Sequence, residues 1–357
     1  MSAPTARRPL PVHSLALVES PAQLLNVVEW AHHQDEQPLD ALRVVVLAPT
    51  DEMTRRQLRA MAALARETGL TVRWHEPRQG GAETARTVRS LAAELSGVDR
   101  LVIGDPFSGV LQVVMSISRP REVVVVDDGT ATFEFARQWV AGEHLSRWHS
   151  VATPGQRRHI AQFARDQISG SVRRRISPEA GCRLSLFSSL DVVLPRVPVV
   201  RNTFAWVRDR FPAPEVKLGA DLIGTSLVET GVVDAEQYLG GVAGLVERYG
   251  VDRYFAHRKE DDAKLAAVAR LGVAVVRPEL PLEIAARLGV LARRLISFPS
   301  TVVHTLPLVL ADTPAELLVC DIADTWYTAG TSVRSEGFLD EVSASARHRF
   351  GLAAAAC

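Results

Sequence analysis

Short apolar runs alternate with longer amphipathic segments along most of the chain, and this alternation limits the possible folds more than any other feature. Leu42–Leu47 (LRVVVL) and Glu122–Val126 (EVVVV) are nearly continuous apolar runs, as expected of strands that are covered on both faces. Segments with helical spacing of apolar residues, such as Pro21–His33, lie between such runs. A repeated β-α order of this kind predicts a parallel sheet with helices on both faces.

The alternation occurs in two blocks. It lapses in the basic segment 145–175 and in the proline-containing segment 177–214, which we interpret as the end of the first domain and a linker. A chain of 357 residues suits two domains of roughly 150 residues each. We therefore predict an α/β protein with two Rossmann-like domains over 1–215, linker included, and 216–357. The last predicted helix, 334–350, is a candidate to pack back on the first domain.

Composition narrows the functional classes. The 41 Lys and Arg residues balance the 41 Asp and Glu residues, which argues against a protein that coats nucleic acid. The three cysteines lie far apart in the sequence, without the spacing of a zinc site, and we expect them to be reduced thiols. Glu19 interrupts the short apolar run near the N-terminus, and no window of about 18 apolar residues occurs. These features predict a cytoplasmic protein.

Asp127, Asp128 and Gly129 directly follow the strand EVVVV. Ligands of parallel α/β sheets bind outside the carboxyl ends of the strands, where a carboxylate is well placed to act as a general base. Adjacent residues of an extended chain point in opposite directions. We therefore expect one carboxylate to face a substrate and the other to hydrogen-bond the loop. The alternative is a solvated turn with an aspartate that caps the next helix.

His257 follows the predicted strand 252–256, and Arg258 and Lys259 come next. A histidine in this place can donate to a phosphate oxygen or, as a cation, stabilise a leaving phosphate. The adjacent cations would add positive potential. The alternative is a surface histidine in a charged turn.

Two weaker signals occur at further strand ends. Ser300 and Thr301 lie between the predicted strand 295–297 and a helix, where N–H groups, the helix dipole and the hydroxyls favour an anion; the alternative is a plain N-cap. Gly224 ends another strand and permits close approach of a ligand to the backbone, or is simply a turn glycine. Together the signals indicate a cleft with a carboxylate base on one side and phosphate-binding groups on the other. Such a cleft suits inverting glycosyl transfer without a metal or cofactor.

The ordered set of motifs resembles that of bacterial lipooligosaccharide sialyltransferases and capsule polysialyltransferases. Those proteins carry an acidic-acidic-Gly motif, a His-Pro motif and a Ser-Ser/Thr motif, and this chain has Asp127-Asp128-Gly129, His257-Arg258 and Ser300-Thr301 in the same order. The segments 20–26 (SPAQLLN) and 223–229 (IGTSLVE) are also similar to the family, so the likeness spans most of the chain. It departs from the family where Arg258 replaces proline and where a Gln-Pro is lacking near Gly224.

The resemblance implies a GT-B fold, with an acceptor-side first domain and a second domain that binds a nucleotide sugar. It implies that Asp127 is the general base, that His257 helps the CMP phosphate to leave, and that Ser300 and Thr301 hold that phosphate or the sugar carboxylate. The other binding residues would be Asp128, Gly129, Gly224 and Arg258. The implied reaction moves sialic acid, or a related nonulosonic acid, from its CMP form to a cell-surface glycan acceptor.

Two other functions fit the same sequence. One is a GT-B enzyme that uses a UDP- or GDP-sugar, and the other is a catalytically inactive two-domain protein that binds a small ligand. A dinucleotide-dependent redox enzyme fits less well, because no GxGxxG follows the first strand. The basic stretch 157–175 suits an acidic acceptor polymer or the anionic inner face of a membrane, or is an ordinary solvated helix.

Overall fold

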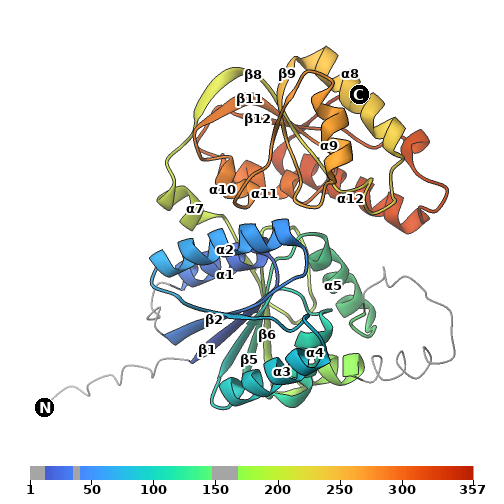
Figure 1. Ribbon diagram of the computed structural model, residues 1–357. Coiled ribbons are helices and arrows are strands. Elements are labelled where there is room, and N and C mark those ends of the chain that lie inside the picture. The colour runs from blue at the N-terminus through green and yellow to red at the C-terminus, as the bar shows by residue number, and fades with distance from the viewer. Residues whose placement is uncertain (1–12, 35–40, 147–167, 357) are drawn as a thin grey trace, which may run out of the picture.

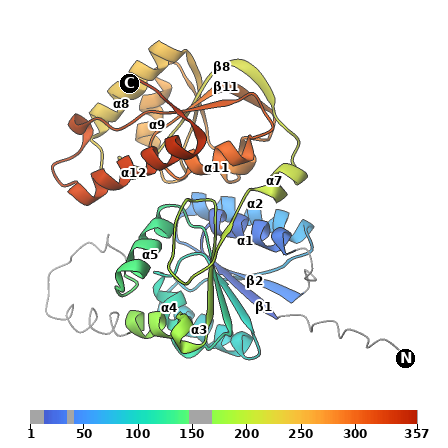
Figure 2. The same cartoon turned by 180° about the vertical axis from the view of Figure 1, so that it is seen from behind.

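The computed structural model describes residues 13–34, 41–146 and 168–356. It consists of two α/β domains stacked on each other, with the first domain below and the second above in Figure 1. Figure 2 shows the same stacking from behind, with the connection between the domains at one side. The predicted GT-B architecture, two Rossmann-like domains that face each other across a cleft, is confirmed.

The first domain contains a seven-stranded parallel sheet with the order β3-β2-β1-β4-β5-β6-β7. Its strands are β1 (Ser14–Val18), β2 (Leu42–Leu47), β3 (Thr71–His75), β4 (Arg100–Ile103), β5 (Glu122–Val126), β6 (Arg183–Ser188) and β7 (Val199–Arg201). Its helices include α1 (Pro21–His33), α2 (Glu52–Glu67), α3 (Gly81–Leu95), α4 (Gly109–Ile117) and α5 (Thr130–Ala141).

The two faces of this sheet belong to two separate apolar cores. Val44 and Val46 of β2 pack in the core that contains α1 and α2, whereas Val45 and Leu47 pack in the core on the other face. Successive side chains of a strand point to opposite faces. The continuous apolar run of β2 is therefore explained by burial on both sides.

The second domain contains a six-stranded parallel sheet with the order β10-β9-β8-β11-β12-β13. Its strands are β8 (Glu215–Ile223), β9 (Val251–Phe255), β10 (Ala274–Val276), β11 (Val290–Ser297), β12 (Glu316–Val319) and β13 (Ala353–Ala354). Its helices are α8 (Ala235–Tyr249), α9 (Asp262–Ala269), α10 (Leu282–Ala285), α11 (Val302–Val309) and α12 (Val333–Phe350). Counted from its own first strand, the order is 3-2-1-4-5-6, the order of the doubly wound Rossmann fold.

The segment 177–214 is not simply a linker. It contains β6 and β7, which extend the first sheet beyond β5 by parallel pairing. Leu184 and Leu186 of β6 are buried in the first domain. The apolar signal of these strands is short and lies between prolines, so the sequence pattern does not predict them. The helix α7 (Ala205–Arg210) then leads to β8.

Several local expectations can be compared with the structure. Asp234 caps α8, as predicted, by accepting hydrogen bonds from two backbone N–H groups, and Pro307 lies inside α11. Cys182 is a free and buried thiol. Cys320, in contrast, is disulfide-bonded rather than a reduced thiol. In the described part of the chain, no helix combines the length and apolarity needed to cross a membrane.

The connection between the domains is anchored to α1. The carboxylate of Glu29 accepts hydrogen bonds from the backbone N–H groups of Trp206 (3.1 Å) and Val207 (2.9 Å) in the first turn of α7. One turn earlier on α1, Asn26 accepts a hydrogen bond from Asn202 at 2.8 Å. The carboxylate therefore supplies acceptors for N–H groups that a helix start leaves without partners.

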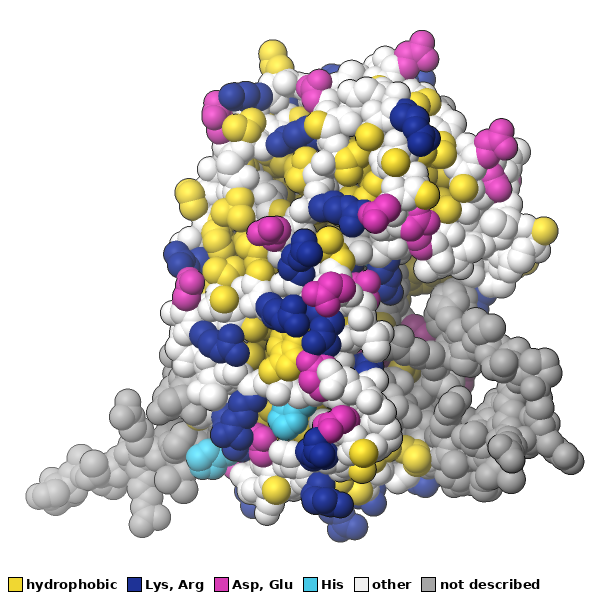
Figure 3. All heavy atoms as spheres, viewed as in Figure 1, with side chains coloured by type: hydrophobic (Ala, Val, Ile, Leu, Met, Phe, Trp, Pro, Cys, Tyr) yellow, Lys and Arg dark blue, Asp and Glu magenta, His cyan; other side chains and the backbone are white. Residues whose placement is uncertain are grey.

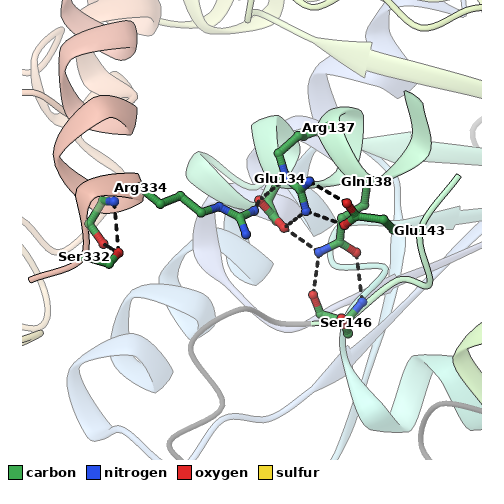
Figure 4. A network of polar contacts seen from close by, with 8 residues as sticks. Glu134, Arg137, Gln138, Glu143, Ser146, Ser332 and Arg334 are labelled. Atoms are coloured by element: carbon green, nitrogen blue, oxygen red, sulfur yellow. Dashed lines mark hydrogen bonds and ion pairs between the residues drawn. The ribbon is translucent and has the colours of Figure 1, made fainter. Parts of the chain in front are cut away.

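Helix α12 also contacts the first domain at both of its ends. Phe338 packs edge-on against Phe133 of α5, with ring centroids 5.8 Å apart, and Arg334 forms an ion pair with Glu134. Figure 4 shows that Glu134 is shared between Arg334 of α12 and a group on α5 that includes Arg137 and Gln138. At the other end, Arg349 donates to the backbone carbonyl of Ser189.

The anchor at Glu29 predicts a pH-dependent stability. Burial raises the pKa of this carboxyl group to about 7. A proton held more tightly in the folded chain stabilises the fold below the unfolded pKa, and this contribution disappears as the pH rises through the folded pKa. The contribution of Glu29 to the free energy of unfolding should fall by roughly 3 kcal/mol between about pH 4.5 and pH 7.5. Urea unfolding across this range should show a smaller pH slope for Glu29→Gln; an identical slope would contradict the prediction.

Candidate active site

A cavity of about 1110 Å³ lies between the two domains. Its walls come from the carboxyl ends of the strands of both sheets, where ligands of parallel sheets bind. The structure places all the site residues expected from the sequence in this wall: Asp127, Asp128, Gly129, Gly224, His257, Arg258, Ser300 and Thr301. Segments that are up to 174 positions apart in the sequence (127 to 301) therefore share one cavity.

The acidic-acidic-Gly and Ser-Thr motifs meet directly across the cavity. A Cβ atom built on Gly129 would lie 3.2 Å from Oγ1 of Thr301, and the φ angle of Gly129 is +65°. Side-chain-bearing residues rarely adopt this angle. Glycine is therefore needed here both for the backbone conformation and for the close approach of the second domain.

The carboxylate of Asp127 is buried and saturated with hydrogen bonds. Oδ1 accepts from Thr132 Oγ1 (2.7 Å) and the N–H of Gly129 (3.2 Å). Oδ2 accepts from Ser188 Oγ (2.8 Å) and from both the N–H (3.2 Å) and Oγ (3.1 Å) of Ser189. Burial raises the pKa of Asp127, and these donors oppose the rise. Such a carboxylate is suited to holding β5, β6 and α5 together.

Asp128 has the more open environment of the two. Its side chain is partly exposed in the cavity wall, and its Oδ1 accepts a hydrogen bond from Ser20 Oγ at 3.1 Å. Burial and the nearby Asp105 raise the pKa of Asp128 to about 7, while Gln23 and Arg258 act in the opposite direction. The sequence predicted Asp127 as the base; in the structure its carboxylate is occupied by protein donors, and Asp128 is the less buried of the two.

His257 is held as a neutral imidazole. Burial, followed by the nearby Arg258 and Lys259, lowers the pKa of His257 to about 3. The N–H of Lys259 donates to Nδ1 at 3.2 Å, so in the neutral ring the proton belongs on Nε2. Of the two roles considered from the sequence, a hydrogen-bond donor to an anion fits this environment better than a resident cation.

A buried carboxylate that the sequence analysis missed positions the His257 loop. Glu260 accepts hydrogen bonds from the N–H of His257 and from the hydroxyl of Tyr254, both at 2.7 Å. It also forms an ion pair with Lys264 at 3.2 Å, and Lys264 donates to the carbonyl of Thr225 at 2.7 Å. This group, Glu260 with Tyr254 and Lys264, therefore joins the two loops that line the second-domain wall.

The same group explains Gly224. A Cβ atom at this position would lie 2.2 Å from Oε1 of Glu260 and 2.4 Å from the hydroxyl oxygen of Tyr254. Real Cβ atoms essentially never come that close to other atoms. Gly224 lines the cavity. Glycine is needed at this position because any side chain would collide with the buried Glu260 group behind it. The sequence suggested only a ligand contact or a turn.

Ser300 and Thr301 lie at the start of α11, as predicted. Thr301 occupies the N-cap position, but its side chain accepts no capping hydrogen bond. Within the described ranges, the hydroxyl groups of Ser300 and Thr301 form no hydrogen bond with the protein. A plain N-cap therefore does not account for them, whereas hydroxyls and free helix N–H groups are ready donors to an anion.

Glu283 is a second residue that the sequence analysis missed. It lies on the short α10, lines the cavity, and accepts a hydrogen bond from Thr305 Oγ1 at 2.8 Å. Burial raises its pKa, and the nearby Arg258 opposes the rise. Its only sequence signal was a glutamate in a loop rich in proline and leucine.

Other expectations concern metals and charge. Among the residues that the structure describes, no three His, Cys, Asp or Glu side chains gather as a metal site. On the face drawn in Figure 3, Lys and Arg are interspersed with Asp and Glu, in keeping with the balanced composition. Residues 157–167 of the basic stretch lie outside the described residues. Arg173 of that stretch stacks on Trp139, with its guanidinium carbon 4.5 Å from the ring centroid.

Comparisons with known proteins do not assign the chain to a family. No family model matches it, and no curated protein matches it. Similar solved structures include E. coli heptosyltransferase WaaC with ADP (12% identity, 94% of this chain and 99% of that chain, TM-score 0.40). They also include Acinetobacter baumannii MurG (11% identity, 96% and 85%, TM-score 0.40) and a UDP-N-acetylglucosamine 2-epimerase, described as putative, from Listeria monocytogenes (9% identity, 97% and 92%, TM-score 0.49).

The packing at Gly224 predicts a selective loss of stability. Gly224→Ala should lower the free energy of unfolding by about 1–3 kcal/mol, because the new methyl group displaces Glu260 or Tyr254. Gly240→Ala is a matched control, since a Cβ atom there meets nothing within 4 Å and alanine favours helix α8 by roughly 0.5–1 kcal/mol. Urea unfolding of both variants measures the difference. If Gly224→Ala and Gly240→Ala have equal free energies of unfolding, the Glu260 group tolerates the methyl group and the prediction is wrong.

Proposed function

We propose that the chain is an inverting, metal-independent glycosyltransferase that transfers a nonulosonic acid, such as sialic acid, from its CMP form to a cell-surface glycan. The observation that carries the proposal is the meeting of a carboxylate from the first domain with unpaired anion-binding groups of the second. Asp128 and Gly129 stand on one side of the cavity, and His257 and Thr301 on the other. The choice of CMP and of the sugar rests on the resemblance of the ordered motifs.

We assign the general base to Asp128 instead of Asp127. The reaction requires a carboxylate that removes the proton of the acceptor hydroxyl as its oxygen bonds to the anomeric carbon. The bond from that carbon to the phosphate oxygen breaks at the same time, and CMP departs with the electron pair. Direct displacement inverts the configuration. Asp128 lines the cavity, and burial raises its pKa to about 7, which is close to the optimum for a base at neutral pH.

The groups of the second domain would stabilise the departing phosphate. His257 has a proton available on Nε2, and the free hydroxyls of Ser300 and Thr301 precede the N-terminus of α11. Donors that are already aimed at a developing negative charge stabilise a transition state without reorganisation. In this proposal the second domain binds the nucleotide sugar, and the first domain provides the acceptor side.

Separate substitution of each aspartate by asparagine tests which of the two is the general base. Asp128→Asn should reduce kcat by at least about 100-fold while nucleotide binding and folding are retained. Asp127→Asn should chiefly lower the free energy of unfolding, because an amide cannot accept all five hydrogen bonds. In the wild type, kcat/KM should rise with pH through about 7 as Asp128 loses its proton. An Asp127→Asn protein with normal stability and no activity would return the role to Asp127.

Thermal shifts with CMP, UMP and GMP, without added metal, test the donor class. A bound ligand raises the melting temperature, because it stabilises only the folded state. We expect a selective rise with CMP. A rise only with UMP or GMP would leave the fold assignment unchanged and would indicate that the donor is a UDP- or GDP-sugar.

The non-enzymatic alternative makes a different prediction. A two-domain protein that only binds a ligand would show a thermal shift but no turnover or hydrolysis of any sugar nucleotide. Turnover of a CMP-sugar that disappears in Asp128→Asn would exclude it. A thermal shift with no turnover of any donor would favour it over the enzyme.

A further inference from the structure

Arg258 is an unusual cation in the cavity wall. Its Nε atom is buried and has no hydrogen-bond partner, and Arg258 forms no ion pair with any residue in the described ranges. The Nε atoms of Arg100 and Arg347 are also buried without a hydrogen-bond partner. Their guanidinium groups, in contrast, form ion pairs, Arg100 with Glu122 at 3.1 Å and Arg347 with Asp321 at 2.8 Å. Partial burial of a polar group without a partner costs free energy. An anionic ligand would remove that cost.

The surroundings of Arg258 define where such an anion would lie. Arg258 follows His257 directly and lines the same cavity as Asp128 and Glu283, and its charge lowers the pKa of both of these carboxyl groups. It is therefore close to the proposed phosphate-binding histidine and to the proposed base at the same time. In a displacement reaction, the carbon under attack must lie between those two groups.

We propose that Arg258 binds the carboxylate attached to the anomeric carbon of a nonulosonic acid donor, and so selects acidic sugars over neutral ones. This inference rests on the proposed function. In a CMP-activated nonulosonic acid, the carboxylate and the phosphate-linking oxygen are bonded to the same carbon. A cation next to the phosphate site and near the base therefore meets this carboxylate. Aldose donors carry hydrogen in its place and would leave the guanidinium unpaired.

The planar guanidinium suits this task. Its fork of N–H donors matches the two oxygens of a carboxylate, whereas the ammonium group of lysine is a compact point charge. A charge-assisted hydrogen bond contributes roughly 1.5–3 kcal/mol, which corresponds to an affinity change of about 10- to 100-fold. Recognition of one carboxylate is therefore sufficient to set the donor class.

Isothermal titration calorimetry with two probes tests the proposal. CMP lacks the carboxylate, and the inert donor analogue CMP-3-fluoro-N-acetylneuraminic acid carries it. Arg258→Gln should weaken binding of the analogue by about 10- to 100-fold and binding of CMP by less than about threefold. Arg258→Lys should recover part of the loss. Arg270→Gln, the same substitution on an exposed residue of the second domain, should change neither affinity and controls for net charge.

The outcomes separate this inference from the proposed function. If Arg258→Gln weakens CMP and the analogue equally, Arg258 is a phosphate ligand and the carboxylate role is wrong. If neither affinity changes, Arg258 contacts no part of the donor. In both cases the proposed CMP donor survives. If the wild-type protein binds neither probe, the CMP donor itself is contradicted, and the carboxylate role with it.

Discussion

The buried carboxylate of Asp127 is the interaction on which the first half of the site depends. Its two oxygens accept hydrogen bonds from α5, from the last residue of β6 and from the residue that follows β6. Its backbone carbonyl accepts from Asn26 of α1 at 2.9 Å. One residue therefore fixes the position of three elements around the end of β5. The adjacent Asp128, which has fewer protein donors, keeps a partly exposed side chain in the cavity wall.

The second domain also contains a buried carboxylate that fixes the backbone of a cavity loop, that of Glu260. Glu260 lies behind the cavity wall and holds the backbone of the His257 loop, and Lys264 extends the hold to the carbonyl of Thr225. Buried carboxylates are costly unless they are paired or hydrogen-bonded. Glu260 has both an ion pair and hydrogen bonds, whereas Asp127 is satisfied by hydrogen bonds alone. Each domain therefore presents a cavity wall whose backbone is fixed from the interior. At Gly224 the Glu260 packing leaves no room for a side chain, and at Gly129 a Cβ atom would lie 3.2 Å from Thr301 of the other domain.

The cavity itself contrasts with the satisfied groups behind it. Asp128 and Glu283 have raised pKa values, Arg258 has a buried Nε atom without a partner, and the hydroxyls of Ser300 and Thr301 are free of protein partners within the described ranges. Unsatisfied polar groups lower the stability of a fold, and they gather where a ligand is to be bound. Groups held in place before binding also lose little entropy when the ligand arrives.

The sequence by itself determined the two parallel sheets, because apolar periodicity is a local property that survives in any context. It also placed the three motifs at strand ends, and hence at one edge of each sheet. It did not identify β6 and β7, because their apolar runs are short and they become strands by pairing next to β5 in the folded sheet. Only the tertiary structure decided which of the two carboxylates is occupied by protein donors, since the partners of Asp127 at Ser188 and Ser189 lie about sixty residues away. The parts played by Glu260 and Glu283 were likewise settled by packing, because a carboxylate acquires its role from neighbours that the chain brings to it only on folding.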